Sequence, residues 1–345
     1  MKKLQVGIIG CGFVAQEKHI PAFLKLKDKV ALTAVCDLNK KNTEGIAKKF
    51  KIPAYSSFSD MLSKENLDAV DICTPPHVHA QLAIEAMKQG SHVLLEKPMA
   101  LKVSDCDDMI HAAQKYGTKL CVVHNQRFRP IYLKAQELVE KGAIGKLTGM
   151  RNLHLTPSYV YMANENSWIH KLPGGVISET GPHDVYTSLI FLKKIKNVSV
   201  HAKKTLDYPW VLYDDYRIEL EGEKINSSLL ISHANDTTSN EVDLLGSEGA
   251  IRVDLQSMLL IYYKRRNVKP LSLVFSSLGN ATQTVKGITL NAFAFLFRKT
   301  FLGHDVLIKK FVNSLINNQA VPVPGEEGRE TIRVMEMIVK KLDQK

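Results

Sequence analysis

The spacing of apolar and polar positions changes near residue 125. Up to that point, short apolar runs alternate with amphipathic stretches of about 10 to 15 residues, which is typical of βαβ units that build a parallel sheet. The apolar runs are β-branched and lack alternation, as in strands buried on both faces. The predicted strands are Gln5–Ile9, Ala31–Cys36, Ala69–Cys73, His92–Leu95 and Lys119–Val123, and the predicted helices are Ile20–Leu26, Lys41–Phe50, His79–Gln89 and Ser104–Tyr116.

Beyond residue 125, longer polar-apolar alternations predict antiparallel strands with one solvated face. These strands are Lys146–Leu155, Tyr213–Glu221, Lys224–His233 and Glu241–Leu245, with helices over Ile131–Lys141, Val306–Asn317 and Gly328–Leu342. We therefore predict an α/β Rossmann domain with a parallel sheet over residues 1–125. An α+β domain with a large, mostly antiparallel open sheet follows over residues 126–345, and its last helices can pack back on the first domain.

One apolar stretch, Val268–Phe301, follows neither the helical nor the strand period. Three roles stay open for it: lining the substrate site, forming a subunit contact, or touching a membrane surface.

Composition agrees with two ordinary globular domains, since 345 residues are 45% hydrophobic and 23% charged. No uncharged apolar stretch reaches the roughly 18 residues of a membrane span, which predicts no stable membrane insertion. The opening MKKLQVGIIG predicts a first strand and not a signal peptide. All five cysteines precede residue 122, and no two have the spacing of a zinc or redox motif, so we expect reduced thiols and a cytoplasmic protein.

The formal net charge of +11 selects no partner by itself. Lysines are scattered, and the densest basic run, Lys264–Arg266, is only three residues long. This distribution favours a solvated surface over nucleic-acid binding, and attraction of a phosphorylated or nucleotide-linked substrate is the main alternative.

A glycine motif directly follows the first predicted strand and precedes a helix. Gly10, Gly12 and Ala15 have the Gly-x-Gly-x-x-Ala spacing, in which the glycines allow a tight turn and a close approach to a pyrophosphate. Asp37 lies 22 residues after Ala15, at the end of the second strand, where a carboxylate can accept hydrogen bonds from ribose hydroxyls.

That carboxylate repels a 2′-phosphate, so the sequence predicts NAD and disfavours NADP. Lys40 and Lys41 nearby leave dual use open, and the structural alternative for Asp37 is a helix cap.

Three further motifs, TPPHVHA (Thr74–Ala80), LLEKPMA (Leu94–Ala100) and LPGGVISETGPHD (Leu172–Asp184), follow in that order. With the glycine motif, the SEGAIRVD turn (Ser247–Asp254) and the closing PVPGEEG segment, the chain resembles the Gfo/Idh/MocA family of glucose-fructose oxidoreductases, inositol dehydrogenases and rhizopine-catabolism proteins. The resemblance implies a sugar-like substrate, and a homodimer or homotetramer formed through the C-terminal sheet.

By position, Lys97 looks like the family's active-site lysine and His183 like its catalytic histidine. Glu179 stands where the family usually has aspartate. Its longer side chain makes the substrate class less certain than the reaction class. If this segment is helical, Glu179 and His183 fall on one face. Oxidising an alcohol carbon requires a base within about 3 Å of the hydroxyl, which a neutral histidine supplies near pH 7. The alternatives without a catalytic role are a surface charge for Lys97, a core or capping role for His183, and support of a substrate-contacting residue or a structural ion pair for Glu179.

The remaining site predictions combine the motifs with the resemblance. Predicted cofactor-binding residues are Gly10, Gly12, Phe13, Val14, Asp37, Thr74, Pro75, His79, Glu96, Lys97 and Asn125. Predicted substrate-binding residues are Trp168, His170, Glu179 and His183, with loop packing as the alternative for the first two. No metal site is predicted, because His77 and His79 lack nearby Cys or acidic ligands.

The leading prediction is an NAD-dependent oxidoreductase acting on a secondary hydroxyl or ketone of a sugar, cyclitol or nucleotide-sugar. Two alternatives stay open. One is glycoside cleavage assisted by transient NAD-dependent oxidation and elimination, and the other is an NAD(H)-binding sensor without turnover.

Overall fold

The computed structural model describes residues 2–264, 269–296 and 303–344 and divides the chain into two compact units. The first comprises residues 1–125 and 302–333, and the second comprises residues 126–301 and 334–345. Each is described by itself below.

The first unit is built on a parallel sheet of six strands in the order β3-β2-β1-β4-β5-β6. Its strands are β1 (Leu4–Ile9), β2 (Val30–Cys36), β3 (Ala54–Tyr55), β4 (Ala69–Ile72), β5 (His92–Leu95) and β6 (Leu120–Val122). They are connected by helices, as the alternating pattern predicts: α1 (Ile20–Leu24), α2 (Lys40–Phe50), α3 (Phe58–Lys64), α4 (His79–Lys88) and α5 (Val103–Tyr116). The order reverses between β1 and β4, and ligands of such sheets bind at this reversal, beyond the carboxyl ends of the strands.

Two helices from the end of the chain extend this unit: α10 (Gly303–Ile316) and the first part of α11 (Gly325–Asp343). The first of them packs against α1, where Lys25 Nζ lies 3.0 Å from Asp305 Oδ2. A short π-helical segment, Ala15–His19, leads from the glycine-rich turn into α1. Such segments are frequent at functional sites.

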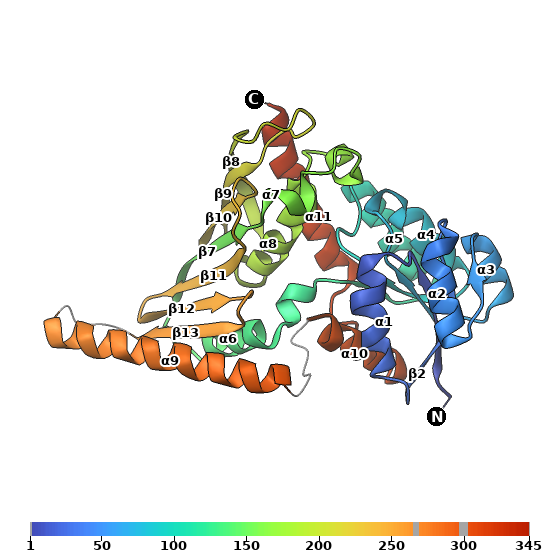
Figure 1. Cartoon of the computed structure of the whole chain (residues 1–345), viewed down its shortest axis with the longest axis horizontal. Helices are drawn as coiled ribbons and strands as arrows, with labels where there is room; N and C mark the ends of the chain where they lie inside the picture. Colours follow the sequence, from blue (N-terminus) through green and yellow to red (C-terminus); the bar gives the residue numbers. More distant parts are fainter. Residues whose placement is uncertain (1, 265–268, 297–302, 345) are drawn as a thin grey trace. The chain divides into compact units, whose positions relative to one another are not determined.

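The second unit is built on a seven-stranded sheet in the order β13-β12-β11-β7-β10-β9-β8, visible at the left of Figure 1. Its strands are β7 (Leu147–Leu155), β8 (Ile195–Lys203), β9 (Asp215–Gly222), β10 (Asn226–Ser232), β11 (Ser239–Gly246), β12 (Gly249–Asp254) and β13 (Leu259–Lys264). All neighbours are antiparallel except β7 and β10. The predicted fold class, a parallel Rossmann sheet followed by a mostly antiparallel sheet, is confirmed.

Alternation along the strands determines which face of this sheet is buried. In β9, Tyr216, Ile218 and Leu220 are buried, while the residues between them are exposed. The buried face packs against α8 (Ile177–Leu192) and the last turns of α11, and α6 (Pro130–Glu140) covers the β12–β13 end. The opposite face carries charged side chains, among them the pair Arg151–Asp243 at 2.6 Å.

Several elements were not predicted, among them α3, β3, β8 and β13, and two further segments differ from their predicted form. The SEGAIRVD segment is a turn only at its start, because Gly249–Asp254 forms β12 and pairs with β11. Most of the stretch that followed neither period is a long helix, α9 (Pro270–Leu296), which packs along β13 (Figure 1). Residues 268 and 297–301 of that stretch lie outside the described residues. None of the described helices is long and apolar enough to cross a bilayer.

Candidate functional site

The glycine-rich turn in the first unit has two glycines with different roles. Gly10 has φ +82°, and a Cβ built on it would lie 2.7 Å from the backbone of Cys73, so only glycine fits there. A Cβ at Gly12 would meet no heavy atom of the described residues within 4 Å. Gly12 is therefore not needed for packing within the unit, and this open backbone suits the approach of a pyrophosphate. Next to it, Phe13 is 73% exposed and Val14 is also on the surface.

Asp37 connects this turn to the end of β2. Its Oδ2 accepts hydrogen bonds from the backbone N–H of Cys11 at 2.7 Å and from Asn42 at 3.2 Å, and its Oδ1 accepts one from the N–H of Asn39 at 2.8 Å. The N-cap of α2 is Asn39, which accepts from the N–H of Lys41, so Asp37 is not the cap of this helix. The carboxylate is partly exposed beside the glycine turn, as contact with a ribose requires.

Thr74, Pro75 and His79 follow β4 at the carboxyl edge of the sheet. The buried Thr74 hydroxyl has no hydrogen-bond partner among the described atoms. His79 is buried, with Nε2 2.8 Å from Thr74 O and Nδ1 3.0 Å from Pro98 O. Burial lowers the pKa of His79, so the ring is neutral and can donate through only one of these nitrogens. This histidine connects the loop after β4 to the loop after β5.

Glu96 and Lys97 follow β5 at the same edge. Glu96 is buried and its Oε2 accepts a hydrogen bond from the backbone N–H of Lys97 at 2.9 Å, while Lys97 itself is partly exposed. The Lys97–Pro98 peptide bond is cis. Asn125 starts a short 3₁₀ segment just beyond β6 and is also partly exposed.

A buried network of four ionisable side chains includes Glu96, the residue before Lys97. The ring of His19 bridges two carboxylates: Nδ1 lies 2.9 Å from Asp71 Oδ2, and Nε2 lies 2.9 Å from Glu96 Oε1. His304 Nε2 is 3.7 Å from the same Glu96 oxygen. The four residues come from the π-helical segment, β4, the end of β5 and α10.

The network holds charge in the interior of the unit. Burial disfavours the charged form of His19, but the charge of Asp71 overcomes it and raises the pKa of His19 well above its usual value. Burial likewise opposes ionisation of Glu96, but the hydrogen bond from His19 and the nearby ring of His304 hold its pKa well below the usual range. Burial lowers the pKa of His304. Glu96 is thereby held as a carboxylate next to Lys97.

Metal binding was not predicted, yet two groups of potential ligand atoms lie within 4.8 Å of one another: those of His19, Glu96 and His304, and those of His19, Asp71 and Cys73. Both ring nitrogens of His19 face carboxylates, and its raised pKa keeps both protonated. A protonated imidazole has no lone pair for a metal, so the arrangement fits a hydrogen-bonded network.

In the second unit, α8 carries the predicted catalytic residues. The helix includes both Glu179 and His183, so the two side chains lie one turn apart on the same face. His183 is partly exposed, and its Nδ1 lies 2.8 Å from the hydroxyl of the buried Tyr186. That hydroxyl also accepts a hydrogen bond from the backbone N–H of Gln126 at 3.0 Å. Tyr186 therefore helps to fix the position of the His183 ring.

Beneath His183, polar side chains are buried against the sheet. Asp184 accepts a hydrogen bond from His154 at 2.8 Å and one from Asn152 at 3.3 Å, both on β7. Thr180, one turn earlier, lies 3.4 Å from Nε2 of His233. Burial lowers the pKa of His233 to about 3, with the neighbouring His154 adding to the shift. These contacts anchor α8 to β7 and to the residue that follows β10.

A pocket of about 320 Å³ opens in the second unit near the predicted sugar-binding segment. His170 lines it together with Gly174, Gly175 and Trp210. His170 Nε2 is also 3.0 Å from Asn164 O. Trp168 is 38% exposed and is not among the lining residues, so the indole near this pocket is that of Trp210.

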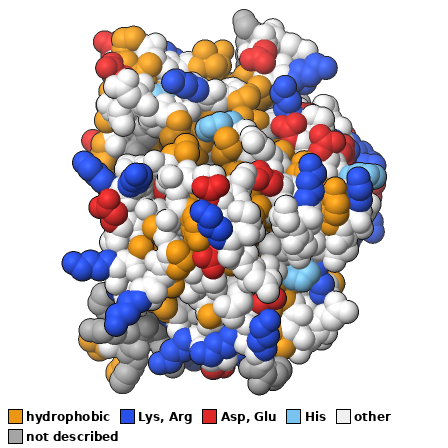
Figure 2. Space-filling view, turned by 90° about the vertical axis from the view of Figure 1, so that its right-hand side faces the viewer, with side chains coloured by type: hydrophobic (Ala, Val, Ile, Leu, Met, Phe, Trp, Pro, Cys, Tyr) orange, Lys and Arg blue, Asp and Glu red, His pale blue; other side chains and the backbone are white. Residues whose placement is uncertain are grey.

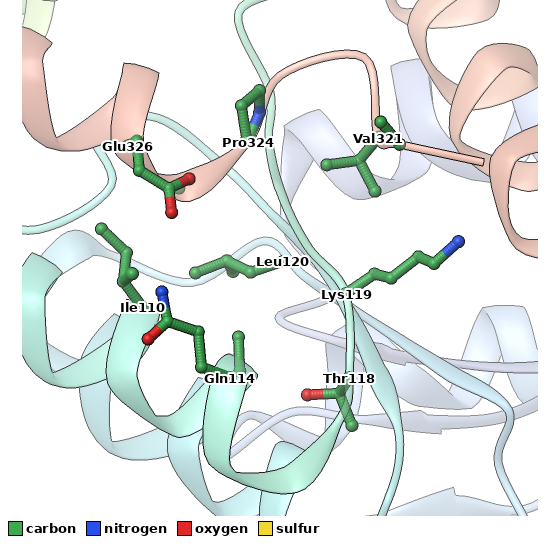
Figure 3. A pocket seen from close by; sticks show the side chains of 11 residues that line it. Ile110, Gln114, Thr118, Lys119, Leu120, Val321, Pro324 and Glu326 are labelled. Carbon is green, nitrogen blue, oxygen red and sulfur yellow. The ribbon is translucent and has the colours of Figure 1, made fainter. Parts of the chain in front are cut away.

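The first unit has another pocket, of about 270 Å³, between α5, β6 and the start of α11 (Figure 3). Thr118 and Lys119, which line it, precede β6 and lie at the amino end of that strand. Ligands of parallel sheets bind at the opposite, carboxyl edge, where Gly10, Thr74 and Glu96 lie. This pocket is therefore separate from the predicted cofactor residues.

Several residues of the site were missed by sequence reasoning. Asp71 had a local signal, because an acid inside the apolar run AVDIC must be paired if it is buried. Tyr186 had a weaker signal, three residues after His183 on a helix. Nothing local marked His304 or Trp210, which join their clusters only through the tertiary fold.

Comparison with known proteins agrees with these features. Residues 4–124 match the oxidoreductase family with an NAD-binding Rossmann fold, and residues 132–252 match the GFO/IDH/MocA C-terminal domain. "Oxidoreductase P35" of Formosa agariphila is 30% identical over 208 residues, covering 57% of this chain and 63% of its own length. The myo-inositol 2-dehydrogenase of Thermotoga maritima is 24% identical over 359 aligned positions, covering 99% of this chain and 97% of that protein.

Among solved structures, the WlbA dehydrogenase of Bordetella pertussis, in complex with NADH and UDP-GlcNAcA, superposes with a TM-score of 0.80. It is 22% identical, and the match covers 99% of this chain and 97% of that one, a similarity that concerns the fold. The predictions of family, oxidoreductase class and NAD as cofactor are confirmed. The chain belongs to the Gfo/Idh/MocA family of oxidoreductases, and its N-terminal unit contains that family's NAD-binding Rossmann domain.

Proposed function

We propose that this protein is a dehydrogenase or reductase in which NAD exchanges a hydride with a secondary hydroxyl or ketone carbon of a sugar, cyclitol or nucleotide-sugar. The observation that carries the proposal is the fixed imidazole of His183, held at Nδ1 by Tyr186 and carried on α8 one turn after Glu179. An imidazole can accept or return a proton near neutral pH.

Lys97 and His183 are proposed to carry the proton transfer. The ammonium of Lys97 stabilises negative charge that develops on the substrate oxygen, and His183 accepts or returns the proton. Glu96 supports Lys97 as a buried carboxylate that accepts its backbone N–H. Glu179 is proposed to orient the substrate through a neighbouring hydroxyl.

The cofactor would be held by the glycine turn and by the loops at the carboxyl edge of the sheet. The open backbone at Gly12 suits the pyrophosphate, and Asp37 suits the adenosine ribose. Phe13, Val14, Thr74, Pro75, His79 and Asn125 are proposed to complete this site. His170 and Trp168 are proposed to contact the substrate, with Trp210 added because it shares a pocket with His170.

Charge on the surface is compatible with a small anionic substrate. Figure 2 shows Lys and Arg side chains distributed over one face among acidic and uncharged groups. Cytoplasmic location and assembly into dimers or tetramers through the outer sheet face stay predictions, and light scattering tests the second.

The test has two stages on one preparation. NADH and NADPH binding are measured by fluorescence, and turnover is then screened over sugars, inositols and nucleotide-sugars for wild type, Lys97→Ala and Lys88→Ala. Lys88 lies on the exposed surface of α4 and serves as the matched control. We expect turnover to vanish only in Lys97→Ala.

Two outcomes would redirect the assignment. Product that forms without matching accumulation of NADH or NAD indicates oxidation-assisted glycoside cleavage. Tight NADH binding without turnover on any compound favours a sensor.

A further inference from the structure

The long helix α9 presents its polar side to its own unit. The less exposed positions recur at helical spacing and are small or polar: Ser272, Ser276, Gly279, Asn280, Gln283, Thr284, Gly287, Asn291 and Ala294. This is the reverse of an ordinary surface helix, which buries its apolar stripe.

Specific hydrogen bonds hold the polar side in place. The amide of Gln283 pairs with the backbone of Tyr262 in β13: Oε1 accepts from Tyr262 N at 2.9 Å, and Nε2 donates to Tyr262 O at 3.1 Å. Asn291 Nδ2 donates to the carbonyls of Ser257 at 2.8 Å and Met258 at 3.0 Å. Because β13 is the last strand of the sheet, Gln283 satisfies part of an edge that would otherwise be open, and Asn291 satisfies two carbonyls of the turn before β13.

The opposite side of α9 is apolar and exposed. Seven large apolar residues on this side are 54% to 73% exposed: Val274, Phe275, Leu278, Val285, Ile288, Phe293 and Leu296. We call these residues the α9 apolar face. A continuous apolar strip on a helix of 27 residues is rare on a monomer without a partner and marks an interaction surface.

Charge around the helix identifies the kind of partner. No acidic residue occurs between Asp254 and Asp305, whereas this interval contains Lys264, Arg265, Arg266, Lys269, Lys286, Arg298 and Lys299. A partner must therefore be apolar and must tolerate or supply negative charge. The same face of a second copy would bring the same positive charge, whereas a bilayer with anionic lipids offers both properties.

We propose that α9 is an interfacial membrane helix that docks the protein on an anionic bilayer. The α9 apolar face enters the boundary between headgroups and acyl chains, and the exposed Lys264, Lys269 and Lys286 contact lipid phosphates and carboxylates. Gln283 and Asn291 keep the helix attached to the sheet. At about 1.5 Å per residue the helix is roughly 40 Å long and lies in the plane of the membrane. This inference is independent of the proposed catalytic function.

Flotation of the full-length protein with phosphatidylcholine vesicles, with and without phosphatidylserine, tests it at low and high salt. The variant Leu278→Ser/Val285→Ser/Ile288→Ser changes only exposed side chains, and Leu245→Ser, on β11 of the same unit and also exposed, is the control. We expect wild type and control to float with phosphatidylserine vesicles, less so at high salt. The triple variant should lose binding by about tenfold or more.

Far-UV circular dichroism and NADH binding check that the triple variant is folded. If it is not, Lys286→Glu, an exposed position on the same helix, replaces it and should weaken binding to the anionic vesicles. The proposal is overturned if wild type does not bind the vesicles, if it binds pure phosphatidylcholine vesicles as well as those with phosphatidylserine, or if the folded variant binds like wild type. Dissociation of an oligomer by the triple variant, with no vesicle binding by wild type, would identify the face as a subunit contact instead.

Discussion

The hydroxyl of Tyr186 lies 2.8 Å from Nδ1 of His183, one turn earlier on α8, with the two rings in an edge-to-face arrangement. Tyr186 is buried, and its oxygen is held in turn by the backbone N–H of Gln126. The position and the tautomer of the histidine thus depend on a neighbour that need not touch the substrate.

Tyr186→Phe keeps the ring and removes this hydrogen bond. We expect kcat on the substrate found in the turnover screen to fall by about tenfold to a hundredfold, with a smaller change in KM, because orientation of the base is lost. The pH profile of kcat should also shift, which a purely structural effect would not cause. Tyr116→Phe, at the end of α5, is the control, and an unchanged pH profile in Tyr186→Phe would contradict the role.

The two glycines of the turn should respond differently to alanine. Gly10→Ala forces a Cβ against the Cys73 backbone at φ +82°, and we expect a loss of about 1–3 kcal/mol in the free energy of unfolding. Gly12→Ala should leave the melting temperature unchanged but weaken NADH binding about tenfold or more, because its Cβ occupies the open space. Thermal unfolding and fluorescence titration measure both, and normal NADH affinity in Gly12→Ala would count against the placement of the pyrophosphate.

Asp71→Asn should disrupt the buried network of His19, Asp71, Glu96 and His304. Removing one partner of a buried ion pair costs about 3–5 kcal/mol, because His19 is left as a poorly compensated charge. Since the pKa of His19 is raised in the folded state, its contribution to stability is complete below its unfolded pKa of about 6.5 and is lost as the pH rises through the folded value.

The stability difference between the variant and wild type should therefore be largest at neutral and acidic pH and should shrink at high pH. Denaturant unfolding over a pH series measures this. Asp107→Asn, which breaks the exposed pair with Arg329, should change little and serves as the control.

His233 should make the second unit sensitive to acid. Its pKa is lowered to about 3, mainly by burial, so the folded state resists a proton that the unfolded chain accepts below about 6.5. Stability from this group is present above pH 6.5 and falls by up to about 1.4 kcal/mol per pH unit between 6.5 and 3. His233→Gln should flatten the pH dependence of the free energy of unfolding in this range. An unchanged slope in the variant would show that other groups cause it.

The sequence by itself determined the Rossmann sheet and the positions of its glycine turn and Asp37. Short apolar runs, helix stops and the glycine spacing are local patterns, and local patterns can be recognised in the sequence without knowledge of the fold. The alternation in β9 and β10 determined the second sheet for the same reason. The short strand β3 was not predicted, because two residues are too few to show a period.

Only the tertiary structure decided how distant segments meet. The network of His19, Asp71, Glu96 and His304 joins four segments spread over most of the chain, and burial of each charge is tolerable only because the others are present. Helix α9 stayed unplaced because pattern reasoning assumes that apolar residues face the core. Here the amide of Gln283 satisfies a sheet edge and that of Asn291 the turn before it, so the apolar residues face outward. No local pattern reveals which side of a helix the rest of the fold will cover.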